Sequence, residues 1–93
     1  MDINHENSGT NGRFYYKVKG KEVATMTYSR TDNDVISIDH TEVDESLKGE
    51  GVGYKLVDAS VEYARTHNLK IKPLCSFVAS VFKKKSEYSD VLV

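Results

Sequence analysis

The segment that most constrains this chain is Lys48-Gly49-Glu50-Gly51-Val52-Gly53, which has glycine at every second position. The residues before it alternate as in a strand, and the residues after it repeat at helical spacing. Glycine lets the backbone turn tightly and leaves N–H groups exposed where a helix begins. Such a turn is suited to bind a phosphate or pyrophosphate, although a simple flexible connection would have the same composition.

Three stretches before this loop, residues 13–19, 22–30 and 35–43, alternate between apolar and polar side chains. The side chains expected to share a face are Phe14, Tyr16 and Val18, then Ala24, Met26 and Tyr28, then Ile36, Ile38, His40 and Glu42. Turn residues at Lys19-Gly20-Lys21 and at positions 31–34 separate the stretches. We therefore expect an antiparallel meander of three strands.

After the loop, apolar side chains recur at steps of three and four, which predicts a helix ending near His67-Asn68. Its apolar face is expected to contain Tyr54, Val57, Val61 and Ala64. Residues 69–75 predict a further strand, in which Pro73 marks a bulge, an edge or the end of pairing. Ser76 can cap a second helix with an apolar stripe of Phe77, Val78, Val81 and Phe82. The order predicts an α+β fold, a meander followed by a β-α-β unit and a C-terminal helix.

The composition is that of one globular domain of 93 residues, with 13 basic residues against 14 acidic ones. With these charges in balance, the chain has no net positive charge that would attract nucleic acid or an anionic membrane, so neither is expected as a partner. We expect residues 1–12, which are polar, to form a flexible tail and residues 13–93 to form the domain. The single cysteine excludes an internal disulfide, and no apolar run resembles a signal peptide or a membrane span. These features predict a cytoplasmic location.

Two common nucleotide loops do not fit the glycine segment. A P-loop ends in Gly-Lys-Ser/Thr, but this segment continues as Gly53-Tyr54-Lys55. A Rossmann loop follows the first strand of a larger parallel sheet, whereas this one follows a meander. The surviving similarity is to the pyrophosphate loop Arg/Gln-x-x-Gly-x-Gly/Ala of the GNAT superfamily, matched here by Lys48, Gly51 and Gly53. Lysine replaces the usual first residue.

Further motifs extend the resemblance over residues 14–93. Ile38-Asp39-His40-Thr41-Glu42-Val43, the glycine loop and Pro73-Leu74-Cys75-Ser76-Phe77-Val78-Ala79 look like a subfamily of short, stand-alone GNAT proteins. The resemblance implies a minimal GNAT fold in which the parallel strands 35–43 and 69–75 splay apart. It also implies an N-acetyltransferase that uses acetyl-CoA as acyl donor, without a metal.

The resemblance implies a donor site between the splayed strands, with pyrophosphate on residues 48–53 and pantetheine along residues 41–43. The cofactor-binding residues expected on this basis are Thr41, Glu42, Val43, Lys48, Gly49, Glu50, Gly51, Val52, Gly53, Tyr54, Phe77 and Phe82. The resemblance implies an amine as acceptor, and a protein or peptide amine is one candidate. Two departures concern the chemistry. First, the turn at residues 19–21 replaces the helices that form one side of the acceptor site in larger relatives. Second, Lys83 occupies the position at which many relatives have a tyrosine that acts as general acid, and Tyr88 is the nearest later tyrosine.

Three residues are candidates for catalysis. His40 is a possible base because histidine titrates near neutral pH, and Glu42 could act as a base through water. Cys75, ahead of a predicted helix, could accept the acetyl group with His40 as its activating base. Structural roles for all three, and direct transfer without an acetylated cysteine, stay open. Acidic residues expected at the mouth of the site, which could attract a cationic amine or simply be solvated, are Asp39, Glu42, Asp44, Glu45 and Glu50.

Two other functions remain from the sequence. The missing wall and the missing tyrosine acid are compatible with a non-catalytic module that binds or senses acyl-CoA. The run Lys83-Lys84-Lys85 could bind nucleic acid, contact CoA phosphates or form a solvated helix end. The chain is expected to be a monomer or a weak homodimer.

Overall fold

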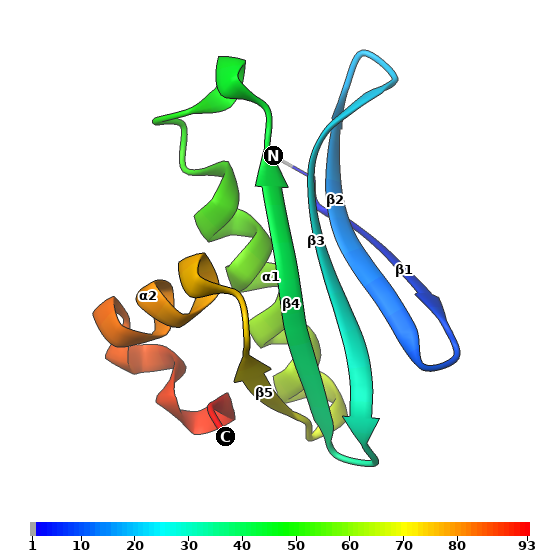
Figure 1. Cartoon of the computed structure of the whole chain (residues 1–93), viewed down its shortest axis with the longest axis vertical. Coiled ribbons are helices and arrows are strands. Elements are labelled where there is room, and N and C mark those ends of the chain that lie inside the picture. The colour runs from blue at the N-terminus through cyan, green and yellow to red at the C-terminus, as the bar shows by residue number, and fades with distance from the viewer. Residues whose placement is uncertain (1) are drawn as a thin grey trace.

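The computed structural model describes residues 2–93 and contains one five-stranded sheet in the order β1-β2-β3-β4-β5 (Figure 1). The strands are β1 Asn4–Ser8, β2 Asn11–Val18, β3 Lys21–Asp32, β4 Val35–Val43 and β5 Lys70–Pro73. The helices are α1 Val52–His67 and α2 Ser76–Lys84, and short 3-10 helices lie at η1 Glu45–Leu47 and η2 Ser86–Val91. Pairing is antiparallel from β1 to β4 and parallel between β4 and β5. The predicted α+β fold is thereby confirmed.

The hairpin between β2 and β3 turns at Lys19 and Gly20, with φ of 52° and 78°. Two consecutive residues of positive φ match the right-handed twist of the flanking strands, which explains why this two-residue turn is favoured. The predicted face of β3 is also confirmed, because Ala24, Met26 and Tyr28 are all buried. They pack toward α1, which crosses behind the sheet in Figure 1. The opposite face carries partly exposed side chains such as Thr25 and Thr27.

The amino terminus differs from the predicted flexible tail, since residues 4–8 form β1 and pair along β2. The His5 ring stacks on Phe14, with centroids 4.3 Å apart and planes 7° from parallel. The Tyr28 hydroxyl bonds to His5 Nε2 and accepts a hydrogen bond of 3.0 Å from Asn7 Nδ2. Side-chain docking therefore compensates for a strand whose composition is polar, and this long-range contact leaves no periodic signal in the sequence.

This docking predicts a stability that depends on pH. Burial, and to a lesser degree the charge of His67, lower the pKa of His5 in the folded chain. The contribution of neutral His5 to the free energy of unfolding is therefore complete above the pKa of an unfolded histidine, about 6.5. This contribution is lost as the pH falls from that value through the lower pKa of His5 in the folded chain. Thermal unfolding between about pH 5 and pH 8 should show wild type losing more stability on acidification than His5→Phe, which keeps the stack without the titration. Identical pH profiles would contradict this.

Strand β4 contains a bulge that overturns one prediction about its faces. Thr27 pairs with His40 but Tyr28 pairs with Ile38, so Asp39 is an extra residue on β4. A bulge shifts the alternation by one position. Ile36 and Ile38 are buried as expected, but His40 and Glu42 do not share their face. Past the bulge, Thr41 takes the core-facing register opposite Met26, and His40 and Glu42 are exposed.

The predicted separation of the parallel strands is present. The β4·β5 pairing ends at Ile38 and Pro73, and β4 continues to Val43 paired with β3 but not with β5. The N–H groups of Leu74 and Cys75 both donate to the carbonyl of Ile38, at 2.9 and 3.0 Å, so the chain leaves the sheet at this point. Figure 1 shows β4 extending past β5 while the chain turns away into α2.

The helices begin slightly earlier than their side-chain patterns predict. Helix α1 starts at Val52, and Tyr54, expected in its apolar stripe, is 36% exposed. The cap of α2 is Cys75 rather than Ser76, and it makes no side-chain capping bond. The end of α1 is confirmed, because Asn68 takes a left-handed conformation there and donates its N–H to the carbonyl of Ala64. Within residues 2–93 no helix has the length and apolarity required to cross a membrane.

Candidate active site

The glycine loop enters α1 through two residues of positive φ, Gly49 at 85° and Gly51 at 76°. Such angles are strained for most residues with a side chain, which explains the glycines. A Cβ at either position would have no neighbour within 4 Å among the described residues, so the outer side of the loop is open. Gly51 caps α1 without a side-chain hydrogen bond. The first N–H groups of the helix are therefore left for a ligand, and the helix dipole favours an anion there.

A cavity of about 510 Å³, which we call the glycine-loop cavity, lies between this loop, the end of β4 and the start of α2. It is lined by Thr41, Val43, Leu47, Lys48, Gly49, Gly51, Val52, Gly53, Tyr54 and Phe77. Its wall is tightly packed, because a Cβ on Gly53 would lie 2.7 Å from the Phe77 ring. Tyr54 meets the same ring edge-on at 5.8 Å. The cavity combines an uncapped helix N-terminus, which suits an anion, with an apolar wall.

Nine of the twelve expected cofactor-binding residues line this cavity, and Glu42, Glu50 and Phe82 do not. Glu42 faces away because of the bulge, and Glu50 is exposed on the loop. Phe82 is only 7% exposed and packs against Tyr88, so it belongs to the core. Leu47 was missed by the sequence reasoning. It lies in η1, whose single turn has no apolar period that could have indicated it.

Cys75 lies beside the cavity wall, with Sγ 3.5 Å from the Thr41 hydroxyl, to which the thiol donates. Burial alone would raise the pKa of this thiol. Hydrogen bonds from the Thr41 side chain and from backbone N–H groups of Val78 and Phe77 outweigh burial, so the net pKa is lowered. The side chain is only partly buried. A partly exposed thiol of lowered pKa at a helix N-terminus is the environment of a reactive cysteine.

The thiol pKa gives a direct prediction. Thr41→Val keeps the shape of the side chain but removes the hydroxyl that stabilises the Cys75 thiolate, so the pKa of Cys75 should rise. Alkylation by iodoacetamide, measured against pH, should have a midpoint below that of an ordinary thiol in wild type and a higher midpoint in the variant. Thr25→Val, on the other face, is the matched control. A midpoint unchanged by Thr41→Val would contradict the assignment.

The structure does not bring His40 to Cys75. His40 and Thr41 are consecutive strand residues and face opposite sides of the sheet, and the thiol contacts Thr41. His40 Nε2 instead lies 2.9 Å from Glu42 Oε1, with 58% and 70% of the two side chains exposed. The predicted activation of Cys75 by His40 is therefore wrong in its geometry, because the Asp39 bulge was not visible in the alternation.

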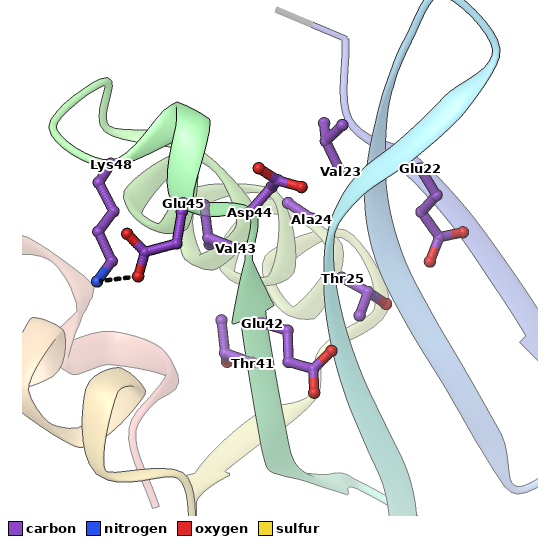
Figure 2. Close-up of a pocket in the computed structure, with 10 residues that line it drawn as sticks. All are labelled: Glu22, Val23, Ala24, Thr25, Thr41, Glu42, Val43, Asp44, Glu45 and Lys48. Carbon is purple, nitrogen blue, oxygen red and sulfur yellow. Dashed lines mark ion pairs between the residues drawn. The ribbon is translucent and has the colours of Figure 1, made fainter.

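A second cavity of about 490 Å³, which we call the acidic cavity, is shown in Figure 2. Its lining residues are Glu22, Val23, Ala24, Thr25, Thr41, Glu42, Val43, Asp44, Glu45 and Lys48. Three of these, Thr41, Val43 and Lys48, also line the glycine-loop cavity. Figure 2 shows Thr41 and Glu42 projecting to opposite sides of β4. The two cavities thus meet at the end of β4, one of them containing the open N-terminus of α1 and the other rich in carboxylates.

Asp39 and Glu50, the other acidic residues predicted at this mouth, do not line the acidic cavity. Asp39 accepts a hydrogen bond of 2.6 Å from Thr27 at the bulge. Glu22, from the start of β3, was missed, because strand pairing rather than sequence proximity places it there. The available sequence signal for Glu22 was its place among the polar, outward-facing positions of the alternating segment 22–30.

Tyr88, the tyrosine nearest to the expected acid position, does not reach either cavity. Its hydroxyl donates to Asp58 at 2.9 Å, and the side chain is 7% exposed. Burial, together with Asp58, raises its pKa to about 12. Tyr88 therefore attaches η2 to α1 and has a structural position.

Comparison with known proteins agrees with this architecture. The chain belongs to the GCN5-related N-acetyl-transferase family, whose model matches residues 13–91. A candidate GCN5-like N-acetyltransferase from Staphylococcus aureus is 40% identical with a TM-score of 0.78, and the match covers 99% of this chain and 87% of that one. No curated protein matches the sequence significantly.

More distant structures share the fold. Aminoglycoside N-acetyltransferase AAC(6')-Iy, solved with CoA, is 12% identical with a TM-score of 0.69, over 89% of this chain and 88% of that one. A candidate streptothricin acetyltransferase from Bacillus anthracis, solved with acetyl-CoA, is 17% identical with a TM-score of 0.65, over 84% and 47%. The predicted membership of the GNAT superfamily is confirmed.

Proposed function

We propose that this protein is an N-acetyltransferase that takes an acetyl group from acetyl-CoA and transfers it to an amine. The observation that carries the proposal is the meeting of two cavities at Thr41, with the thiol of Cys75 in contact with the same residue. Acetyltransferases of this fold that were solved with CoA or acetyl-CoA support the donor. The family supports the reaction class.

The glycine-loop cavity is proposed to bind the donor. Its free N–H groups at Gly51 and the following residues would hold the pyrophosphate, as helix N-termini hold anions. The pantetheine arm would lie between Phe77 and the end of β4, where β5 no longer pairs with β4. This path brings the thioester to Thr41 and Cys75.

The proposed chemistry uses an acetylated Cys75. The thiolate sulfur forms a bond to the thioester carbonyl carbon, the bond from that carbon to the CoA sulfur breaks, and the CoA thiolate leaves and is protonated by solvent. The ammonium group of the acceptor first loses one proton, and the neutral amine nitrogen then attacks the acetyl carbon with its lone pair. The bond from that carbon to Cys75 breaks, the Cys75 sulfur leaves as the thiolate, and the nitrogen loses its second proton to solvent to give the amide. Glu42 lines the acidic cavity on the side of β4 opposite to Cys75, so it is a base candidate for the amine while that amine is held in the acidic cavity, where it takes the ammonium proton through water. Thr41 stabilises the thiolate without itself carrying charge.

The acidic cavity is proposed to bind the acceptor. Four carboxylates line it, from Glu22, Glu42, Asp44 and Glu45. Glu22 is paired with Arg13 and Glu45 with Lys48, so among the described residues Glu42 and Asp44 are the two without a lysine or arginine partner. That excess of negative charge favours a cationic amine, since opposite charge raises the local concentration of such a substrate. The cavity lies at the end of the sheet, on the partly exposed face that carries Thr25 and Thr27. An exposed site of this kind suits a protein or peptide acceptor better than a small molecule that must be enclosed. A lone reduced thiol is also consistent with a cytoplasmic enzyme.

The experiment is a screen of purified protein with acetyl-CoA and a panel of amines, including lysine peptides, free protein N-termini and polyamines, that measures CoA release. Acetylation of a cationic amine is expected, with neutral amines poorer. Binding of acetyl-CoA without turnover on any amine would contradict the enzyme and favour a non-catalytic acyl-CoA module.

A further inference from the structure

Lys85 is the C-cap of α2, and its side chain lies beside the Tyr54 ring. Its Nζ lies 5.6 Å from the centroid of the Tyr54 ring, and Tyr54 lines the glycine-loop cavity. A cation over the face of a tyrosine is held by the ring quadrupole. The ammonium group is thereby fixed at the rim of the cavity rather than extended into solvent.

This charge is available to a ligand. Among residues 2–93, no carboxylate lies within ion-pair distance of Lys85, whereas Lys48 on the cavity wall is paired with Glu45 at 3.0 Å. Lys85 is also partly buried, while Lys83 and Lys84 in the same turn are exposed. An ordered, unpaired ammonium group is therefore present at one place on this rim.

The position of Lys85 relative to Cys75 indicates which part of the donor it meets. Cys75 caps the start of α2 and Lys85 caps its end, so they are separated by about 15 Å at 1.5 Å of rise per residue. Tyr54 contacts both ends of this span, through Phe77 and through Lys85. A donor with its thioester at Cys75 and its pyrophosphate at Gly51 therefore extends its nucleotide end along α2 toward Lys85.

We propose that Lys85, held over Tyr54, binds the 3′-phosphate of CoA and makes the enzyme selective for CoA thioesters over their 3′-dephospho analogues. This inference rests on the proposed function. The nucleotide end of CoA carries one anionic group beyond the pyrophosphate, and the helix N-terminus is already used by the latter. Lys85, beside a residue that lines the cavity, supplies a counter-charge for this additional group.

The test is to titrate CoA and 3′-dephospho-CoA into wild type, Lys85→Gln and the matched control Lys84→Gln. Wild type and Lys84→Gln are expected to prefer CoA by about tenfold, the effect of one charge-assisted contact. Lys85→Gln should reduce that preference to near unity by weakening CoA alone. Circular dichroism of each variant confirms that α2 is retained.

Three results would overturn the inference while leaving the proposed function intact. These are equal affinity of wild type for both ligands, equal weakening of both ligands by Lys85→Gln, or the same effect from Lys84→Gln. Absence of binding of either ligand to wild type would overturn the proposed function as well, so the two failures are distinguishable.

Discussion

Gly51→Asp is expected to weaken acetyl-CoA binding by about 100-fold or more, because a carboxylate would lie where the pyrophosphate binds and like charges in one site cost several kcal/mol. The open space beside the Gly51 Cα is where the new side chain must go. Calorimetric titration with acetyl-CoA measures the loss. Folding should persist, because aspartate accepts the left-handed conformation of this position better than most residues and is a favoured N-cap.

Gly51→Asn is the matched control. Asparagine has nearly the same size, the same tolerance for positive φ and the same capping ability, but no charge. It should lose much less affinity than Gly51→Asp. Equal losses in the two variants would mean that bulk or backbone strain, rather than charge, explains the effect, and the anion site at α1 would be contradicted.

Cys75→Ser is expected to lower the rate of acetyl transfer by roughly 10³-fold or more, as removal of a nucleophile does in other acyl-transfer enzymes. Serine is close in size and keeps a hydrogen-bonding group near Thr41, but its hydroxyl is not ionised by the contacts that lower the pKa of Cys75. Affinity for acetyl-CoA should stay within a few-fold of wild type, because the sulfur does not line the glycine-loop cavity. The expected change is therefore in kcat rather than in binding.

Mass spectrometry of the protein quenched during turnover provides the control for this prediction. Wild type should carry one acetyl group on Cys75, and Cys75→Ser should not accumulate it. Full activity in Cys75→Ser together with an unmodified Cys75 in wild type would show direct transfer to the amine. That result would contradict the acetylated Cys75 intermediate but not the proposed acetyl-CoA and acceptor sites.

Local signals in the sequence were sufficient for much of the fold. Lys19-Gly20 specified a tight hairpin, Asn68 ended α1, and Pro73 marked where β5 stops pairing. Each acts within a few residues of itself, through backbone angles or a missing N–H group. The glycine loop was predictable for the same reason, since its function depends on local backbone geometry.

The errors arose where distant residues decide the outcome. The docking of β1 depends on His5 meeting Phe14 and Tyr28, which no periodicity encodes. The bulge at Asp39 shifted every side chain after it to the opposite face, so a correct strand gave an incorrect placement of His40. Phe82 had the right spacing for a helix face, but spacing cannot distinguish the core from the cavity wall.

An NMR titration of the 10.5 kDa chain with acetyl-CoA, following backbone amide shifts, tests the acetyl-CoA site itself. If acetyl-CoA binds in the glycine-loop cavity, saturable changes are expected at Gly51 to Tyr54, at Thr41 and Val43 on β4, and at Phe77 on α2. No saturable change, or changes confined to other parts of the sheet, would contradict the acetyl-CoA site and the acetyltransferase function built on it.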